Sequence, residues 1–595
     1  MIFLAAFALL AHGDYHYASH EGSNEYPYTS WETAAHMIQE AVDASEPYDT
    51  VYIGSGEWYE IIDMDLADSC VAIIGRGMDS TLIWTDRNEY MILRAHKTSF
   101  KDICFRHLGT YGAVILAYYG PGWPQDVYVN RCKFEGYRNA LGILGSYAAN
   151  HIIENSIFDS LSAYDGAIAG PYARVEFRNN ICNLGRLAGL CIYAGGQYFL
   201  VENNYFQAPV RGFEGLIFHA EGLLDTLIVQ NNIIKYFNGA AKMLRVSRGS
   251  KFAYNVLDSL SFTAPQPAVN IAYIEDDSLD FVEVIGNSIR HDDESIGIRV
   301  YPGPFGVVAS VRYNNFWDVE TPIVPEYPDI YDSVGNTFND PMYVGSFDFH
   351  LQMFSPLIDA GDPEIPDPDG SRSDIGVYGG PLGEVYDYQD LPPLIPDSIY
   401  AYVTSDTVTI NWHFNTEADF NHYLLYRDTV TGFEPSISNL IGEPDSSLYV
   451  DTDIDLNHNY YYRIASVDDQ NNVSDYSEEL AVILTDVRGL WGDNVPLLTS
   501  IVGNYPNPFN SRTIIRYNVG NIGPIPVDIS IIIYDVLGRE VKEIVEKERY
   551  PGEYEVTWDG RDNGGSELTS GVYFVKIVQW EDKIESRPRK IMLLK

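Results

Sequence analysis

A recurring asparagine constrains this chain more than any other feature of its sequence. Nine segments between residues 127 and 338 hold an Asn followed two places later by an apolar residue or cysteine, as in "VEFRNNICN" and "FLVENNYFQA". Successive copies lie 21 to 32 residues apart, and a second, apolar motif recurs in step with them, from "GAVILA" at 112 to "GIRVY" at 297. The asparagines of this frame are Asn130, Asn155, Asn180, Asn204, Asn232, Asn255, Asn287, Asn315 and Asn336.

Two short strands in each repeat, with no room for a helix between them, predict a parallel β-solenoid. Its coils lie about 4.8 Å apart, so that equivalent side chains stack in columns. An Asn at each corner can then bond to the Asn or the backbone of the next coil. Cys104, Cys132 and Cys182 fall two places after a corner residue, so we expect them to fill the core. Cys104 and Cys132 would be stacked and could bridge, and we expect a reduced buried pair instead.

The charge balance restricts the partners of the chain. Its 38 Lys and Arg residues against 84 Asp and Glu residues give a net charge of −46. Such a surface repels nucleic acid and anionic lipid, because phosphate contacts need Lys and Arg. It suits a secreted protein that can bind divalent cations such as Ca²⁺. The sequence therefore predicts no nucleic-acid partner.

The first residues favour export from the cell. Residues 1–13, "MIFLAAFALLAHG", are typical of a signal peptide, although no basic residue precedes the apolar run, and a buried strand is the alternative. No later run reaches the length of a transmembrane span. The 595 residues exceed one compact core, so several domains are expected.

The stretches "TSWETAAHMIQEAVDASEPYDTVYIGSGEWYE", "VAIIGRGMDSTLIW" and "TSFKDICFRHLG" resemble the opening of right-handed parallel β-helix proteins of the pectin-lyase-like superfamily. The resemblance spans about 28–382 and implies a right-handed parallel β-helix over 14–390, with a capping helix from about Trp31 to Ala44. That superfamily includes pectate lyases, polygalacturonases and many proteins without demonstrated activity. Its enzymes act on the outer face of the helix.

The candidate groove is a column of stacked side chains that follows the second strand of each repeat. It turns polar and aromatic at Tyr193 and continues through His219, Arg245, Tyr273 and Tyr301. The tyrosines could stack sugar rings, and His219 or Arg245 with Glu275 is the candidate acid/base pair. The alternative is that these side chains only cover the coils.

A second candidate site lies in "DPDGSRSD". Asp367, Asp369 and Asp374 alternate around a glycine there, as in part of a calcium loop, but the downstream bidentate Glu is missing. The alternative is a turn whose amides are satisfied by its own Asp side chains.

Two β-sandwiches are expected to follow, so the predicted fold class is all-β throughout. Residues 391–488 alternate apolar and polar residues and resemble a fibronectin type III domain, with Trp412 as its core tryptophan. After a linker at 489–502, residues 503–595 resemble the C-terminal sorting domain of type IX secretion, an immunoglobulin-like sandwich related to the one in flagellar hook-cap proteins. The resemblance places the sorting signal at Asn504, Pro506, Asn507, Pro508, Phe509, Trp558, Asp559, Gly571, Tyr573, Lys590 and Lys595.

The resemblance to the sorting domain implies export by the type IX machinery, to the medium or the outer surface of a Gram-negative bacterium. Three functions stay open at this stage. The solenoid binds carbohydrate or another surface partner, or it is a lyase or hydrolase of acidic polysaccharide, or the chain is a structural adhesion or surface-layer protein. Whether the chain is an enzyme is left undecided by the sequence.

Overall fold

The structure is a computed structural model with two compact units, Met1–Asp390 and Leu391–Lys595. It describes residues 13–64, 70–87, 92–93, 97–108, 116–117, 126–136, 143–144, 150–161, 166–171, 174–184, 190–195, 198–207, 216–220, 226–235, 241–244, 249–260, 267–272, 282–291, 296–301, 309–325, 331–403, 407–455, 458–484, 499–510, 512–520, 527–535, 538–550, 552–579, 584–586 and 588–594. The predicted signal peptide lies almost wholly outside these residues.

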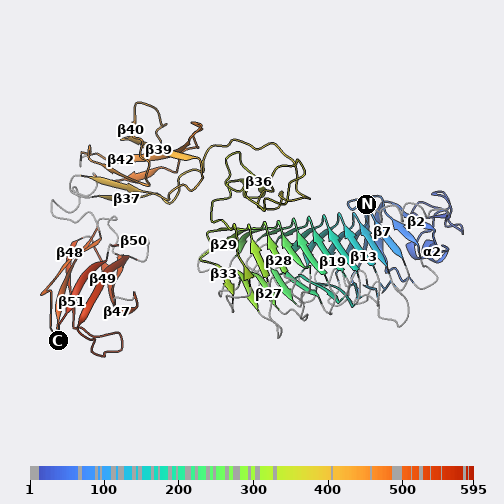
Figure 1. Ribbon diagram of the computed structural model, residues 1–595, viewed down its shortest axis with the longest axis horizontal. Helices are drawn as coiled ribbons and strands as arrows, with labels where there is room; N and C mark the ends of the chain where they lie inside the picture. The colour runs from blue at the N-terminus through green and yellow to red at the C-terminus, as the bar shows by residue number, and fades with distance from the viewer. Residues whose placement is uncertain are drawn as a thin grey trace. The chain divides into compact units, whose positions relative to one another are not determined.

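The first unit is a parallel β-solenoid, and the all-β fold class is confirmed. Three parallel sheets, named A, B and C here, run along it with 13, 11 and 8 strands (Figure 1). Sheet A contains β1 (Tyr15–Ala18), β2 (Thr50–Ile53), β4 (Ala72–Ile74), β7 (Thr98–Lys101), β10 (Val127–Asn130), β13 (Asn150–Glu154), β16 (Arg174–Arg178), β19 (Tyr198–Glu202), β22 (Thr226–Gln230), β25 (Lys251–Ala253), β28 (Val282–Ile285), β31 (Ala309–Arg312) and β34 (Tyr331–Asp332).

Sheets B and C follow A in each coil. Sheet B contains β3 (Gly56–Tyr59), β5 (Thr81–Thr85), β8 (Cys104–His107), β11 (Lys133–Gly136), β14 (Ile157–Leu161), β17 (Ile181–Leu184), β20 (Tyr205–Gln207), β23 (Ile233–Lys235), β26 (Val256–Leu260), β29 (Ser288–His291) and β32 (Asn315–Trp317). Sheet C contains β12 (Ile143–Leu144), β15 (Gly166–Pro171), β18 (Leu190–Gly195), β21 (Leu216–Ala220), β24 (Ala241–Leu244), β27 (Pro267–Ala272), β30 (Ile296–Tyr301) and β33 (Thr321–Pro325). A short pair, β6 (Ile92–Leu93) and β9 (Leu116–Ala117), lies beside them.

The corner between sheets A and B takes two residues. The first adopts a left-handed backbone, as Asn179 does with φ 55°, and asparagine tolerates this conformation. The second is buried and joins a ladder in which each amide Nδ2 and each backbone N–H donates to the Oδ1 of the next asparagine. The ladder runs through Asn180, Asn204, Asn232, Asn255, Asn287, Asn314 and Asn336.

The predicted corner role is confirmed for seven of the nine asparagines, since six take the inward place and Asn155 stands at its corner and donates to Asn130 of the neighbouring coil. It is wrong for Asn130 and Asn315. Asn155 is the left-handed residue of its corner, so Ser156 takes the inward place. Asn130 ends β10, and Cys132 takes the inward place of that coil. Asn314, and not Asn315, belongs to the ladder, because Asn315 begins β32. The inward residue lies two places after Asn130, one place after Asn155 and one place before Asn315.

The solenoid core is built from alternating residues of each strand. Sheet B contributes a row of stacked rings, with centroids 5.5 Å apart between Phe105 and Phe134 and 5.0 Å apart between Phe134 and Phe158. Cys182 continues that row in register and is fully buried, as predicted.

The other two cysteines of the repeat do not stack on each other. Cys104 is the register partner of Lys133, whereas Cys132 occupies the corner one residue earlier. The expected stacking of Cys104 on Cys132 is therefore wrong. Both thiols are free, and burial raises the pKa of Cys132 to about 12, which makes it inert.

The cap at the N-terminal end is shorter than predicted. The helix α2 covers only Ile38–Asp43, and the carboxylate of Glu60 accepts its first amide, Ile38 N–H, at 2.9 Å. The helix does not begin at Trp31, because the preceding segment pairs its backbone with β1, through Tyr17 N–H to the Tyr28 carbonyl and Ala35 N–H to the Tyr17 carbonyl.

The last part of the unit, residues 341–390, folds back along the solenoid, and we call it the closing segment. It contains the hairpin β35 (Tyr343–Gly345) and β36 (Asp348–Leu351). Asn231 donates to the carbonyls of Val377 and Gly379, and Tyr343 donates to Ser288 at 2.7 Å. The segment therefore covers part of the outward face of sheet B.

The second unit begins with a small sandwich. Its sheets are β37 (Tyr400–Val403), β38 (Val408–Asn411) and β41 (Leu448–Asp451), against β40 (Leu440–Gly442), β39 (Phe420–Asp428), β42 (Tyr460–Asp468) and β43 (Leu480–Val482). Trp412 is buried and meets the ring of Tyr423 edge-on at 5.0 Å. This is the core position predicted for Trp412.

A second sandwich completes the unit. One sheet is β44 (Ser500–Tyr505), β45 (Thr513–Val519) and β48 (Gly552–Trp558), and the other is β47 (Glu540–Arg549), β46 (Val527–Tyr534), β49 (Gly571–Gln579) and β50 (Ile584–Glu585), with β51 (Arg589–Leu593) also paired to β49. All strand pairs in it are antiparallel.

Candidate functional site

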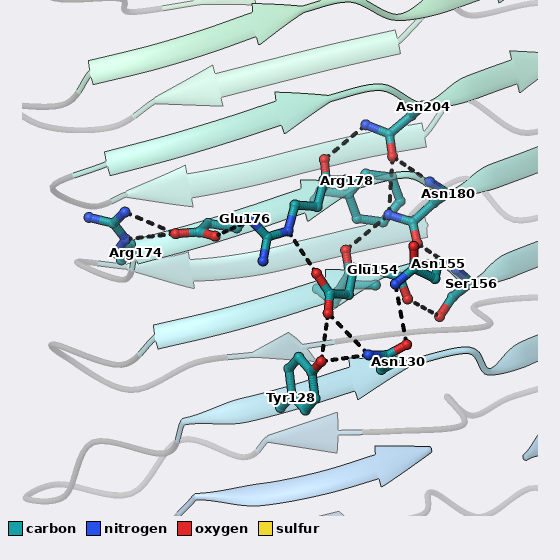
Figure 2. Close-up of polar contacts among 12 residues, drawn as sticks. Tyr128, Asn130, Glu154, Asn155, Ser156, Arg174, Glu176, Arg178, Asn180 and Asn204 are labelled. Carbon is teal, nitrogen blue, oxygen red and sulfur yellow. Dashed lines mark hydrogen bonds and ion pairs between the residues drawn. The ribbon is translucent and has the colours of Figure 1, made fainter. Parts of the chain in front are cut away.

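A cluster of polar side chains lies on the outward face of sheet A, where three coils meet (Figure 2). Glu154 accepts from the hydroxyl of Tyr128 at 2.5 Å and from Asn130 at 3.1 Å through one oxygen. Its other oxygen accepts from Nε of Arg178 at 2.8 Å. The carboxylate therefore joins β10, β13 and β16, and we call Tyr128, Asn130, Glu154 and Arg178 the Glu154 cluster.

The polar surface continues sideways along the same face. Nη1 of Arg178 lies 3.4 Å from Oε2 of Glu176. The other oxygen of this carboxylate, Oε1, lies 2.9 Å from Nη2 of Arg174. The guanidinium of Arg174 lies over the ring of Tyr198, 4.2 Å from its centroid. The side chain of Arg174 is 48% exposed, so water and solutes reach this end of the surface.

The protonation states of this cluster favour binding over proton transfer. Burial, and then the bond to Glu154, raise the pKa of Tyr128 to about 12, so that its hydroxyl stays protonated at neutral pH. Burial is the largest single effect on Arg178 and lowers its pKa, but the bond to Glu154 and the attraction of Glu154 and nearby carboxylates together raise the pKa above its ordinary value. Efficient acid–base catalysis needs a pKa near the working pH, which neither group has. Guanidinium and hydroxyl donors can instead hold the oxygen atoms of a ligand.

The groove expected on sheet C falls largely outside the described residues. Arg245, Tyr273 and Glu275 all lie beyond them. For Tyr193, His219 and Tyr301 the structure describes the strands β18, β21 and β30 that carry them.

The strand register does not preserve the expected column of sheet C. Tyr193 pairs with His219, but His219 pairs with Leu244 and Tyr301 pairs with Ala272. Positions 245 and 273 are thus one residue past that row. Whether these residues bind or catalyse stays a prediction.

The loop that contains Asp367, Asp369 and Asp374 is a turn in which the Asp side chains accept hydrogen bonds from nearby backbone amides. Asp367 accepts the amides of Asp374 and Gly380, and Asp369 accepts the amide and hydroxyl of Ser371. Asp374 accepts the amide of Asp359 and the hydroxyl of Tyr388. Burial raises the pKa of Asp367 to about 7. Within the described ranges, these three carboxylates do not converge as the ligands of one ion would.

Several residues of the predicted sorting signal meet in the last sandwich. Asn507 accepts the amide of Met592 at 2.9 Å, and Phe509 donates to the Met592 carbonyl at 2.9 Å. The ring of Phe509 lies 5.3 Å from that of Trp558, which in turn lies 5.6 Å from Tyr573.

The remaining sorting residues lie around this contact. Asn507 Nδ2 donates to the Lys590 carbonyl at 3.4 Å, and Gly571 pairs with Leu593. Asn504 donates to the Pro506 carbonyl, and Asp559 accepts the amide of Arg561. Pro508 precedes Phe509, and Lys595 lies outside the described residues. Asn507 and Phe509 thus cover the free edge of β51.

Sequence reasoning missed the Glu154 cluster. Glu154 lies 24 to 26 residues from each of the other members and meets them only through the strand register. A signal was present, because Asn130, Glu154 and Arg178 each stand two places before the inward residue of their corner. Aligning the repeats on the inward corner residue would have placed all three in one column.

One comparison with known protein families matches the C-terminal part of the chain. Residues 523–583 match the family described as FlgD Ig-like domain. No curated protein matches the chain. In the part of the chain that the structure describes, no helix is long and apolar enough to cross a membrane.

Solved structures resemble the chain locally. A Fn3-like protein from Clostridium thermocellum is 24% identical, covers 15% of this chain and 90% of its own, and has a TM-score of 0.14. Dimeric latent PorU from Porphyromonas gingivalis is 14% identical over 34% of this chain and 20% of its own, with a TM-score of 0.17. Chicken CNTN1 FN1-FN3 domains are 15% identical over 34% of this chain and 68% of their own, with a TM-score of 0.13.

Proposed function

We propose that this chain is a surface or adhesion-type protein in which the solenoid holds a partner and the C-terminal sandwich directs export. The observation that carries the proposal is the pairing of a long β-solenoid with a FlgD Ig-like module at its C-terminal side. Solenoids offer extended surfaces for binding, because equivalent side chains of successive coils stand in rows.

The partner that fits best is a carbohydrate carrying acidic groups. The row from Tyr128 to Tyr198 on sheet A holds guanidinium, hydroxyl and amide groups on successive coils, which lie about 4.8 Å apart. Arg174 can turn from Glu176 toward a carboxylate of the ligand, since its side chain is half exposed. The overall charge of −46 repels a densely charged polymer, which favours a glycan of mixed neutral and acidic sugars.

Glycan binding is tested with the full chain on a panel of neutral and acidic polysaccharides. The Arg174→Ala and Tyr198→Ala variants should bind the captured glycan at least tenfold more weakly. Arg516→Ala is the matched control, because this exposed arginine pairs with Glu555 in another domain. Equal loss in the control, or no glycan bound by the wild type, would contradict the proposal.

An enzyme that cleaves acidic polysaccharide is the alternative, motivated by the resemblance of the solenoid to pectin-lyase-like proteins and by His219, Arg245 and Glu275. The same panel decides between them when unsaturated products and new reducing ends are followed with calcium and with chelator. Turnover would support the alternative and direct attention to sheet C.

Export through type IX secretion is proposed for the C-terminal sandwich, with a secreted or outer-surface location. It is supported by the convergence of Asn507, Phe509, Trp558 and Tyr573 in one contact. Removing residues 503–595 should retain the protein inside cells that possess this system. Unchanged export of the shortened chain would refute this role.

A further inference from the structure

Lys235 and Asp258 form a buried ion pair on the outward face of sheet B. They are register partners on β23 and β26, and Nζ of Lys235 lies 3.5 Å from Oδ2 of Asp258. Their side chains are only 1% and 6% exposed. Taking two charges out of water costs several kcal/mol per ion, which mutual attraction repays only in part. On an outward sheet face this pair would stand in water, and it is the closing segment that buries it and imposes this cost.

The closing segment keeps water away from the lysine. Nζ of Lys235 donates to the carbonyl of Ser346. The ring of Phe347 lies 4.0 Å from Nζ and that of Phe349 lies 5.3 Å from it. A dry site protects an amide from hydrolysis once it has formed.

From this juxtaposition we infer that Lys235 and Asp258 become joined by an amide bond, a covalent crosslink between two neighbouring coils. Within the ion pair a proton first passes from Nζ to Oδ2, which frees the lone pair of the amine and leaves a carboxylic acid. Nζ then attacks Cγ of Asp258, and the bond from Cγ to Oδ2 breaks. Oδ2 leaves as water with two of the three ammonium hydrogens, and the third stays on the amide nitrogen. Oδ1 remains as the amide oxygen, so atoms and charge balance without any oxidant or co-reactant.

The neighbouring groups suit each part of this step. The register holds the two side chains side by side, with Nζ 3.5 Å from Oδ2, the oxygen that takes its proton and then leaves. Nη1 of Arg290 lies 3.7 Å from Oδ1, the oxygen that carries negative charge when the tetrahedral intermediate forms. The ion pair is itself destabilised by burial, so its conversion to a neutral amide removes two buried charges.

A second lysine and aspartate serve for comparison and should not react. They are not register partners, and Nζ of Lys133 lies closer to Glu135, at 2.5 Å. On the same sheet, Nζ of Lys133 lies 3.9 Å from Oδ2 of Asp159, but the two side chains are 24% and 36% exposed. Water reaches this second pair, so it stays ionic. The crosslink goes beyond the proposed function and does not depend on it.

A tryptic peptide map of the purified, unfolded full chain tests the crosslink directly. We expect no cleavage after Lys235 and a branched peptide that joins residues 212–242 to 252–290, lighter by one water than its two parts. Cleavage after Lys133 should be normal. Lys235→Arg and Asp258→Ala should each abolish the branched peptide. Recovery of the linear peptides 212–235 and 252–290 at their sequence masses, without the branched species, would overturn the inference, and this result needs no variant to fold.

Discussion

Replacing one asparagine of the ladder should destabilise the solenoid far more than replacing its neighbour. Asn204 is 2% exposed and accepts both the backbone amide of Asn180 at 2.9 Å and its Nδ2 at 3.1 Å. Its own Nδ2 donates to the Phe177 carbonyl at 2.8 Å and to Asn232 at 2.9 Å. Asn204→Leu removes these four bonds while keeping a side chain of similar volume.

The magnitude follows from what is left without a partner. The backbone amide of Asn180 is buried and loses its acceptor, which costs about 1–3 kcal/mol, and each of the three other bonds contributes about 1 kcal/mol. Burial of the leucine methyl groups offsets about 1–2 kcal/mol. We therefore expect the free energy of unfolding to fall by roughly 3 kcal/mol.

Two further variants grade the effect. Asn204→Ser should lose about half as much, since Ser156 occupies the same column and its Oγ accepts the amide of Cys132 at 3.1 Å. Asn203→Gly is the control, because Asn203 is exposed with φ 54° and glycine adopts this backbone freely. Its effect should stay within about 0.5 kcal/mol.

Urea titration gives the stability, and hydrogen exchange at residue 180 gives the local effect. Protection of the Asn180 amide should fall in Asn204→Leu and persist in Asn203→Gly. Equal midpoints for these two variants, with the Asn180 amide still protected, would show that the ladder does not stabilise the corner in the way its geometry implies.

Three other outcomes are expected. Both ring nitrogens of His151 are buried without a partner, so His151→Leu should raise the free energy of unfolding by about 1–3 kcal/mol. Burial also lowers the pKa of His151 to about 4, below its unfolded value of 6.5, so urea midpoints of the wild type should fall as the pH drops through this window, and those of the variant should fall less. Burial raises the pKa of Asp367 to about 7, so the contribution of this group to stability is present at low pH and is lost as the pH rises from about 4 to 7. Proteolysis of the closing segment should therefore be slower at pH 5 than at pH 8. Asp367→Asn should make this difference smaller. Asn507→Ala removes the acceptor of the Met592 amide, so the amides of β51 should exchange hydrogen faster while those of β45 do not change. Equal exchange rates of β51 in the variant and the wild type would show that this bond does not hold the strand edge.

Much of the architecture could be predicted because a solenoid repeats. A spacing of 21 to 32 residues with two short apolar runs leaves few alternatives to stacked coils. Alternation likewise placed Trp412 in the core of its sandwich, and the block around Asn507 marked a place where chain segments meet. Each of these patterns is local, because a few neighbouring residues are enough to define it.

The sequence alone determined the kind of fold, the repeat and its strongly acidic surface. Only the tertiary structure decided which of two adjacent asparagines, 179 or 180, turns inward, because that depends on which one takes the left-handed backbone. It also decided that Tyr128, Glu154 and Arg178 meet, and that the closing segment buries Lys235 with Asp258. Such contacts join residues that are far apart in the chain. They depend on the strand register and on the path of the closing segment along the solenoid, and no local sequence preference specifies either.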